Sequence, residues 1–194
     1  MTRIVLTKPD IDRALKRIAH EIVESQRGRF GLVFLGIPTR GVHLARRLAR
    51  LVADIEPQEV QVGTLDVTMY RDDLLTQSTR ATVATEIPAS GIDGSTVILV
   101  DDVLFSGRTV RAALDAITAL GRPDAVRFAV LVDRGHRELP IRADFVGKNL
   151  PTSTTRPLSV TDSKPTAWQR LARQPRQSLM QRRSLSKHER DTQN

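Results

Sequence analysis

The stretch V97-I-L-V-D-D-V-L-F-S-G-R-T-V110 decides the fold of this chain. Its first four residues are aliphatic, as in a strand buried on both faces of a parallel sheet. Two adjacent carboxylates, Asp101 and Asp102, follow them, and the hydroxyl-bearing Ser106 and Thr109 come a few residues later. In an open parallel sheet, ligands bind where strands end and loops lead into helices. The order of these groups therefore predicts a ligand site directly after a strand at 97–100.

The turn F105-S-G-R-T109 has the properties of a binding site for a phosphate monoester. It leads into a helix predicted at 109–120, so backbone N–H groups and the positive end of the helix dipole converge with the two hydroxyls. Gly107 permits a positive backbone angle or the close approach of an anion. A nucleoside-triphosphate loop would have the pattern G-x-x-x-x-G-K-[ST], and this turn has neither that spacing nor the lysine. ATP is therefore disfavoured as the substrate.

The two carboxylates would repel a phosphate, so they need a different partner. Vicinal hydroxyls donate hydrogen bonds to carboxylates, and Mg²⁺ prefers oxygen ligands while it keeps several of its waters. A phosphorylated ribose with Mg²⁺ satisfies both halves of the stretch. The alternative is an ordinary strand end, with a solvated acidic pair beside a helix cap.

Strands alternate with helices on both sides of this stretch. Asp10 is expected to cap a helix that ends near Gly28 and carries apolar residues at helical spacing. Strands are predicted at 31–37, 60–69, 97–100 and 125–133, and further helices at 42–53 and 109–120. This alternation predicts an α/β fold with a mostly parallel, twisted sheet that helices cover on both faces.

Composition and charge narrow the class of protein. The 194 residues suffice for one domain, and the absence of cysteine excludes disulfides, thiolate zinc sites and a thiol nucleophile. No stretch reaches the roughly 18 apolar residues of a membrane helix, and the N-terminus lacks a secretory signal, so we expect a cytoplasmic protein without a membrane partner. Residues 1–150 carry 21 Lys and Arg against 19 Asp and Glu, whereas 151–194 carry 9 against 3. Most of the basic charge thus lies in the tail, which weakens the case for a nucleic-acid surface on the body.

Two segments do not fit a compact core. Residues 71–94 form a long polar connection, which inside a domain is usually functional or disordered, and we expect a lid. Residues 152–194 are rich in Ser, Thr, Gln, Arg and Pro and hold too few large apolar side chains to offset their ordering entropy. We therefore expect one domain at 1–153 and a basic, disordered, low-complexity tail at 154–194.

The stretch V97-I-L-V-D-D-V-L-F-S-G-R-T109 resembles the PRPP-binding motif of the type I phosphoribosyltransferases. Three further stretches, L35-G-I-P-T-R-G41, L65-D-V-T-M-Y-R-D-D-L74 and the segment 130–153, resemble the PyrR family of pyrimidine (pyr) operon regulators and uracil phosphoribosyltransferases. The resemblance runs from about residue 10 to residue 153. It implies the type I phosphoribosyltransferase fold with a small hood. It also implies conversion of uracil and PRPP to UMP and pyrophosphate, with Mg²⁺ carried mainly by PRPP or pyrophosphate and no metal ligand set from the protein.

The resemblance also implies roles for single residues. Ser106, Gly107, Arg108 and Thr109 would hold the 5′-phosphate, and Asp101 and Asp102 the ribose hydroxyls. The whole implied PRPP-binding set is Thr39, Arg40, Asp101, Asp102, Val103, Leu104, Phe105, Ser106, Gly107, Arg108 and Thr109, and the implied catalytic set is Arg40, Arg71, Asp101, Asp102 and Arg134. By itself, Arg40 would be a solvated loop cation. Arg71 would be the cation of the lid, and Arg134 would lie near pyrophosphate or base, whereas His136 fits a structural role better than that of a base.

Messenger RNA is the second ligand that the resemblance implies. In the PyrR family, a basic surface on the dimer binds pyr mRNA in response to uridine nucleotides such as UMP and UTP. The matching residues are Lys16, Arg17, His20, Arg137, Arg142 and Lys148. The first three fall with Arg13 on the polar face of the first predicted helix, a pattern that alone indicates a solvated face. Because no aromatic residues interleave with them, recognition would depend on backbone charge and a folded RNA shape. The resemblance further implies a homodimer or a higher homo-oligomer.

The sequence departs from the family after Ser153, where relatives continue with strand-forming residues that complete the hood over the base. We expect the last strands, and with them part of the base pocket, to be missing here. A basic tail that adds nonspecific RNA affinity is the alternative. Two other functions stay open at this point. They are a noncatalytic RNA-binding regulator that senses nucleotides through the PRPP site, and a phosphoribosyltransferase of purine salvage.

Overall fold

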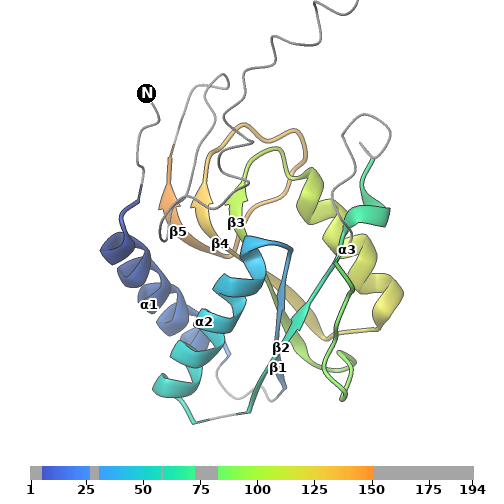
Figure 1. Cartoon of the computed structure of the whole chain (residues 1–194), viewed down its shortest axis with the longest axis horizontal. Coiled ribbons are helices and arrows are strands. Elements are labelled where there is room, and N and C mark those ends of the chain that lie inside the picture. Colours follow the sequence, from blue (N-terminus) through green and yellow to red (C-terminus); the bar gives the residue numbers. More distant parts are fainter. Residues whose placement is uncertain (1–5, 27–30, 58, 73–82, 151–194) are drawn as a thin grey trace, which may run out of the picture.

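A five-stranded parallel sheet lies at the centre of the protein (Figure 1). The computed structural model describes residues 6–26, 31–57, 59–72 and 83–150. Along the chain come α1 (Lys8–Ser25), β1 (Leu32–Gly36), α2 (Arg40–Ile55), β2 (Val60–Thr64), the 3-10 helix η1 (Thr68–Tyr70), β3 (Thr96–Leu104), α3 (Arg108–Leu120), β4 (Ala125–Asp133) and β5 (Phe145–Asn149). The strand order is β2-β1-β3-β4-β5, and every neighbouring pair is parallel. The predicted α/β class with a parallel sheet is thus confirmed.

Helices cover both faces of this sheet, with α1 and α2 on one face and α3 on the other (Figure 1). Successive side chains of a strand point to opposite faces. In β3, Ile98 and Val100 accordingly belong to the core under α1 and α2, whereas Val97 and Leu99 belong to the core under α3. Because both cores need apolar residues, the strand reads as an unbroken aliphatic run until its acidic pair.

The first helix begins one turn earlier than predicted. Thr7, not Asp10, is its N-cap, and Asp10 lies in the first turn, where its carboxylate accepts hydrogen bonds from the Thr7 N–H at 2.9 Å and the Thr7 hydroxyl at 2.6 Å. These hydrogen bonds hold the pKa of Asp10 below its ordinary value, and the bond from the Thr7 hydroxyl has the larger effect. The sequence suggested Asp10 because it directly precedes the apolar repeat, but Pro9 suits the first turn of a helix and moves the cap back to Thr7.

Three strand predictions need correction. The strand predicted at 60–69 ends at Thr64, and the Leu65 N–H makes the last ladder bond, to the Gly36 carbonyl at 3.0 Å. The Asp66 carboxylate then accepts a hydrogen bond from the Thr68 N–H at 2.9 Å, and η1 begins. The strand predicted at 97–100 continues to Leu104, so the acidic pair lies within the strand and not after it. β5 at the sheet edge was not predicted, since a five-residue run with a glycine and a lysine has little strand character.

Parts of two predicted segments lie outside the described residues. Of the predicted lid, the structure describes 71–72 and 83–94, and residues 73–82 are outside it. The predicted tail at 154–194 is wholly outside, as is the predicted helix end at Gly28. None of the helices in the described part of the chain has the length and apolar character needed to span a membrane.

Candidate active site

The candidate site lies at the carboxyl ends of β1 and β3, which are neighbours in the sheet. Gly36 pairs with Val100, and the Ile37 N–H donates to the Val100 carbonyl at 2.9 Å. At Gly41, in the first turn of α2, a Cβ atom would lie 2.3 Å from the same carbonyl oxygen. Only glycine lets α2 start this close to β3. The loop after β1 therefore reaches the acidic end of β3.

Arg40 and Asp102 meet at this junction. Their side chains form an ion pair at 2.7 Å with 24% and 21% of their surfaces exposed. Arg40 is the first residue of α2, and Thr39 is its N-cap. The resemblance placed Arg40 and Asp102 in one PRPP-binding set, and the structure brings the two side chains into direct contact. A pair of this kind offers a cation to an anionic ligand and a carboxylate to a hydroxyl from a single point.

Asp101 lies beside this pair. Its Oδ1 accepts a hydrogen bond from the Asp102 N–H at 2.8 Å, which fixes the orientation of the carboxylate. Asp101, Asp102 and Val103 are half-buried, between the buried start of β3 and the buried Leu104. The acidic pair is thus held on a rigid strand.

The predicted phosphate loop leads into α3. Gly107 is the N-cap of this 13-residue helix with φ of 93°, so the positive backbone angle allowed for in the sequence is present. The Ser106 hydroxyl accepts a hydrogen bond from the Arg108 N–H at 3.4 Å. The guanidinium of Arg71 donates to the Thr109 hydroxyl at 3.2 Å. Arg71, the first residue of the predicted lid, is thus brought to the phosphate loop.

The side chain of Arg108 contacts carboxylates from two other segments. It donates to Glu138 at 2.6 Å and to Asp72 at 2.5 Å. The hydrogen bonds to Glu138 and then to Asp72 raise the pKa of this guanidinium above its ordinary value. The side chain of Arg108 therefore joins the start of the predicted lid to the segment after β4. Only its backbone N–H, which donates to Ser106, takes part in the phosphate loop.

Arg134 is a buried cation at the end of β4. Its N–H donates to the Leu104 carbonyl at 3.0 Å, and its guanidinium carbon lies 4.7 Å from the centre of the Phe105 ring. The ring of His136 stands edge-on to Phe105 with 6.1 Å between centroids, and the backbone of His136 has φ of 56°. Two of the predicted site residues, Arg134 and Phe105, are thus stacked at the edge of the phosphate loop.

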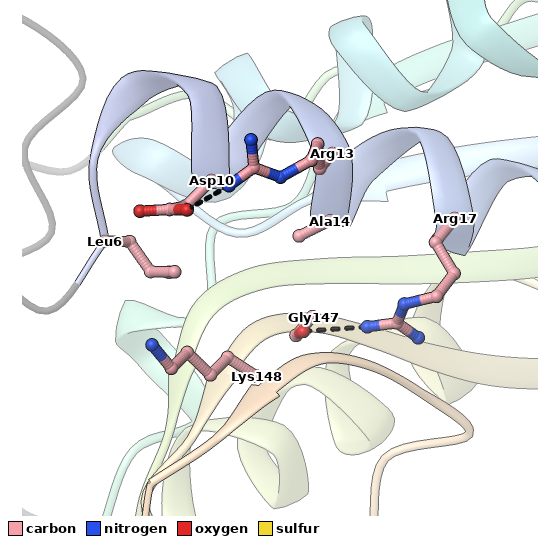
Figure 2. A pocket seen from close by; sticks show the side chains of 7 residues that line it. All are labelled: Leu6, Asp10, Arg13, Ala14, Arg17, Gly147 and Lys148. Carbon is pink, nitrogen blue, oxygen red and sulfur yellow. Dashed lines mark hydrogen bonds and ion pairs between the residues drawn. The ribbon is translucent and has the colours of Figure 1, made fainter.

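A second candidate site is a basic groove between α1 and β5 (Figure 2). It encloses about 330 Å³, and its lining is Leu6, Asp10, Arg13, Ala14, Arg17, Gly147 and Lys148. The structure brings Arg17 and Lys148 together here although 131 positions separate them in the chain. Part of the Arg17 guanidinium is already engaged, since it donates to the Val146 and Gly147 carbonyls at 2.9 and 2.7 Å and to Glu21 at 2.6 Å.

The other predicted RNA-binding residues are distributed around this groove or away from it. Lys16 and His20 are exposed on α1, and Arg142 is exposed in the connection before β5. Arg137 is different, because its guanidinium is directed at Asp133 and at backbone carbonyls next to the phosphate loop. The groove also contains Arg13, which the sequence placed on the same polar face but the resemblance did not match to the RNA surface.

Among the described residues, no three His, Asp or Glu side chains gather as a metal site. Asp101 and Asp102 are an adjacent pair, and Asp102 is already bound to Arg40. The oxygen donors of such a pair would suit a magnesium ion held mainly by the phosphates of a ligand.

Comparison with known proteins assigns the class first. The model of the phosphoribosyl transferase domain matches residues 2–159. The fold is similar to the hypoxanthine phosphoribosyltransferase of Trypanosoma cruzi (TM-score 0.63, 22% identity, 76% of this chain and 81% of that one). It is also similar to a hypoxanthine-guanine phosphoribosyltransferase of Bacillus anthracis (0.63, 21%, 78% and 85%). The protein therefore has the type I phosphoribosyltransferase fold, as predicted.

Closer relatives assign the family. The chain is 67% identical over 151 residues to the bifunctional protein PyrR of Streptomyces coelicolor, and the aligned region covers 78% of each chain. It is 66% identical over 160 residues to the bifunctional protein PyrR of Leifsonia xyli, and the aligned region covers 80% of this chain and 87% of the relative. The chain belongs to the PyrR family.

Proposed function

We propose that this chain carries both activities of the PyrR family, transfer of phosphoribose from PRPP to uracil and uridine-nucleotide-dependent binding of pyr mRNA. The observation that carries the first activity is the junction of β1 and β3. There the acidic pair of β3 meets the loop cation Arg40, and the same strand leads into the N-terminus of α3. Family membership supports both activities.

In this proposal, PRPP is bound at three points. The amides of 106–109 and the hydroxyls of Ser106 and Thr109 hold the 5′-phosphate at the start of α3. Asp101 and Asp102 accept hydrogen bonds from the ribose hydroxyls. Thr39 and Arg40 hold the pyrophosphate, so Arg40 exchanges part of its contact with Asp102 for the ligand.

The chemistry requires no protein nucleophile. As the bond from the ribose to pyrophosphate breaks, positive charge develops on the sugar and negative charge on the leaving group. Arg40, Arg71 and the buried Arg134 stabilise the leaving group, and the rigid strand positions the ribose for attack by the base nitrogen. Closure over the site keeps water away from the sugar cation.

Magnesium fits this site as an ion carried by PRPP. Bound there, it would offset charge on the pyrophosphate, and Asp101 and Asp102 would be the carboxylates that orient its waters.

The basic groove between α1 and β5 supports the second activity. Arg13, Arg17 and Lys148 line it, and only Asp10 among its lining residues is acidic, so an RNA phosphate fits there (Figure 2). Arg142, Lys16 and His20 extend the surface, and a homodimer would present it twice. Because PRPP and mRNA are both cytoplasmic, we place the protein in the cytoplasm.

An assay of pyrophosphate release with uracil, hypoxanthine and guanine tests the first activity. We expect turnover with PRPP and uracil alone. Turnover only with a purine would refute the substrate assignment, and no turnover with any of the three bases would leave a noncatalytic regulator.

Filter binding to a pyr leader RNA, with and without UMP, tests the second activity. Arg13→Gln should weaken binding and lower the slope of log affinity against log salt by about 0.7 to 0.9. Arg122→Gln is the charge-matched control, because Arg122 is exposed before the amino end of β4 and does not line the groove. An equal slope in both variants would contradict the assignment of the groove.

A further inference from the structure

The segment after β4 supports the phosphate loop from outside. The Ser106 carbonyl accepts two hydrogen bonds, from the N–H groups of Glu138 at 3.0 Å and Leu139 at 3.2 Å. The Cβ atom that a side chain would add at Gly107 lies 3.4 Å from the Leu139 Cβ atom. The conformation of the loop therefore depends on where residues 137–141 lie.

Arg137 holds this segment in place. Its guanidinium donates to the Phe105 carbonyl at 2.8 Å, to the Gly135 carbonyl at 3.0 Å and to the Ile141 carbonyl at 2.9 Å. It also forms an ion pair with Asp133 at 2.5 Å. One side chain thus joins the end of β4, both sides of the 134–141 turn and the first residue of the phosphate loop.

The burial and charge of this pair fit a structural cation. The side chains of Arg137 and Asp133 are 20% and 18% exposed. Burial, the largest single influence, favours protonation of Asp133, but hydrogen bonds from Arg137 and the Gly135 N–H, together with the charge of Arg137, hold its pKa below the ordinary value. All of the contacts that Arg137 makes are charge-assisted or to carbonyl oxygens, which suit the five donors of a guanidinium and not the single ammonium of lysine.

We propose that Arg137 is a positioning residue for the phosphate loop, which sets the backbone of Phe105 and Ser106 for the 5′-phosphate, and that it makes no direct contact with RNA. This inference rests on the proposed PRPP site. It assigns Arg137 to the transferase side of the molecule, whereas resemblance to the family placed it on the RNA surface.

Direct binding of PRPP by calorimetry, with Mg²⁺ present, measures the role. Arg137→Gln should weaken PRPP binding at least about tenfold, the effect of losing one charge-assisted hydrogen bond to the loop. In turnover, the KM for PRPP should rise while kcat at saturating PRPP changes less than about threefold. Arg137→Lys should recover only part of the affinity, because lysine cannot serve Asp133 and three carbonyls together. Arg122→Gln, with the same loss of charge, should bind PRPP as the wild type does.

RNA binding separates positioning from contact. The salt slope for a pyr leader RNA should be the same for Arg137→Gln as for the wild type, whereas Arg142→Gln should lower it by about 0.7 to 0.9. A lower slope in Arg137→Gln, or an affinity for PRPP equal to that of Arg122→Gln, would overturn the proposal.

Hydrogen exchange tests the geometry without any ligand, and so separates a failure of this inference from a failure of the PRPP site. In Arg137→Gln, the amides of Glu138 and Leu139 should exchange faster, while the Phe34 amide in the centre of β1 should keep its protection. Unchanged exchange rates at the Glu138 and Leu139 amides would refute the positioning role even if the wild type bound no PRPP. If Arg137→Gln does not fold, Arg137→Lys and Asp133→Asn provide the same comparison in milder form.

Discussion

The ion pair between Arg40 and Asp102 leads to a prediction that separates PRPP from pyrophosphate. In Asp102→Asn, the ribose loses a carboxylate acceptor, and Arg40 loses its partner at 2.7 Å. The loss of the acceptor weakens the binding of a ligand that carries the ribose diol. The loss of the ion pair strengthens the binding of any ligand that carries pyrophosphate, because Arg40 no longer has to give up its contact with a carboxylate.

The two effects differ in size. A hydrogen bond to a charged group contributes about 1.5 to 3 kcal/mol, so its loss should weaken PRPP binding about 10- to 150-fold. Release of an ion pair that is about one-fifth exposed contributes up to about 1 kcal/mol, so pyrophosphate should bind up to about fivefold more tightly. The net result for PRPP is a loss, and for pyrophosphate a gain.

Calorimetric titration of Asp102→Asn with PRPP and with pyrophosphate, both with Mg²⁺, gives the two constants. Asp124→Asn is the matched control. It removes the same charge at an exposed residue before the amino end of β4, whereas Asp102 lies near the carboxyl end of β3. A parallel loss of both ligands would mean that Asp102 serves the pyrophosphate through magnesium or through Arg40. Unchanged PRPP affinity would remove the acid from the ribose site altogether.

Three further predictions follow from other contacts. Gly107→Ala places a side chain on a backbone with φ of 93°, so it should lower the free energy of unfolding by about 1 to 2 kcal/mol and raise the KM for PRPP. A denaturant titration measures the first effect, and an unchanged unfolding midpoint would contradict the left-handed cap. Because the pKa of Asp133 is lowered on folding, its ionisation stabilises the protein above its unfolded pKa of about 4, and this stabilisation is lost as the pH falls through the lowered pKa. Unfolding of Asp133→Asn at pH 7 and at pH 3 should therefore differ from wild type more at the higher pH, and a constant difference would refute the linkage. Arg17→Gln removes the donor to two β5 carbonyls, so it should lower the free energy of unfolding by about 1 kcal/mol and also weaken RNA binding. Arg13→Gln loses only an exposed ion pair with Asp10, so it should weaken RNA binding with a smaller change in stability.

Local sequence predicted the elements whose pattern is local. The aliphatic runs of β1, β3 and β4 and the repeats of α1, α2 and α3 have the period of the structure that they form, so their positions came within a few residues. The positive backbone angle at Gly107 could also be predicted, since few residues other than glycine suit such a turn between a strand and a helix. β5 was missed because F145-V-G-K-N149 lies at the sheet edge, where its stability comes from packing on α1 and pairing with β4 and not from its own composition.

The contacts within the site were less accessible, because they depend on strand order. Nothing in the sequence states that β3 lies between β1 and β4, yet this order alone brings Arg40 to Asp102 from one side and Arg134 to Phe105 from the other. For Arg137, the i,i+4 spacing to Asp133 would suggest a helix, but the residues form a turn, and the carbonyls that the guanidinium binds leave no trace in the sequence. The structural role proposed for Arg137 therefore rests on contacts with three carbonyl oxygens and Asp133 that only the folded chain brings together.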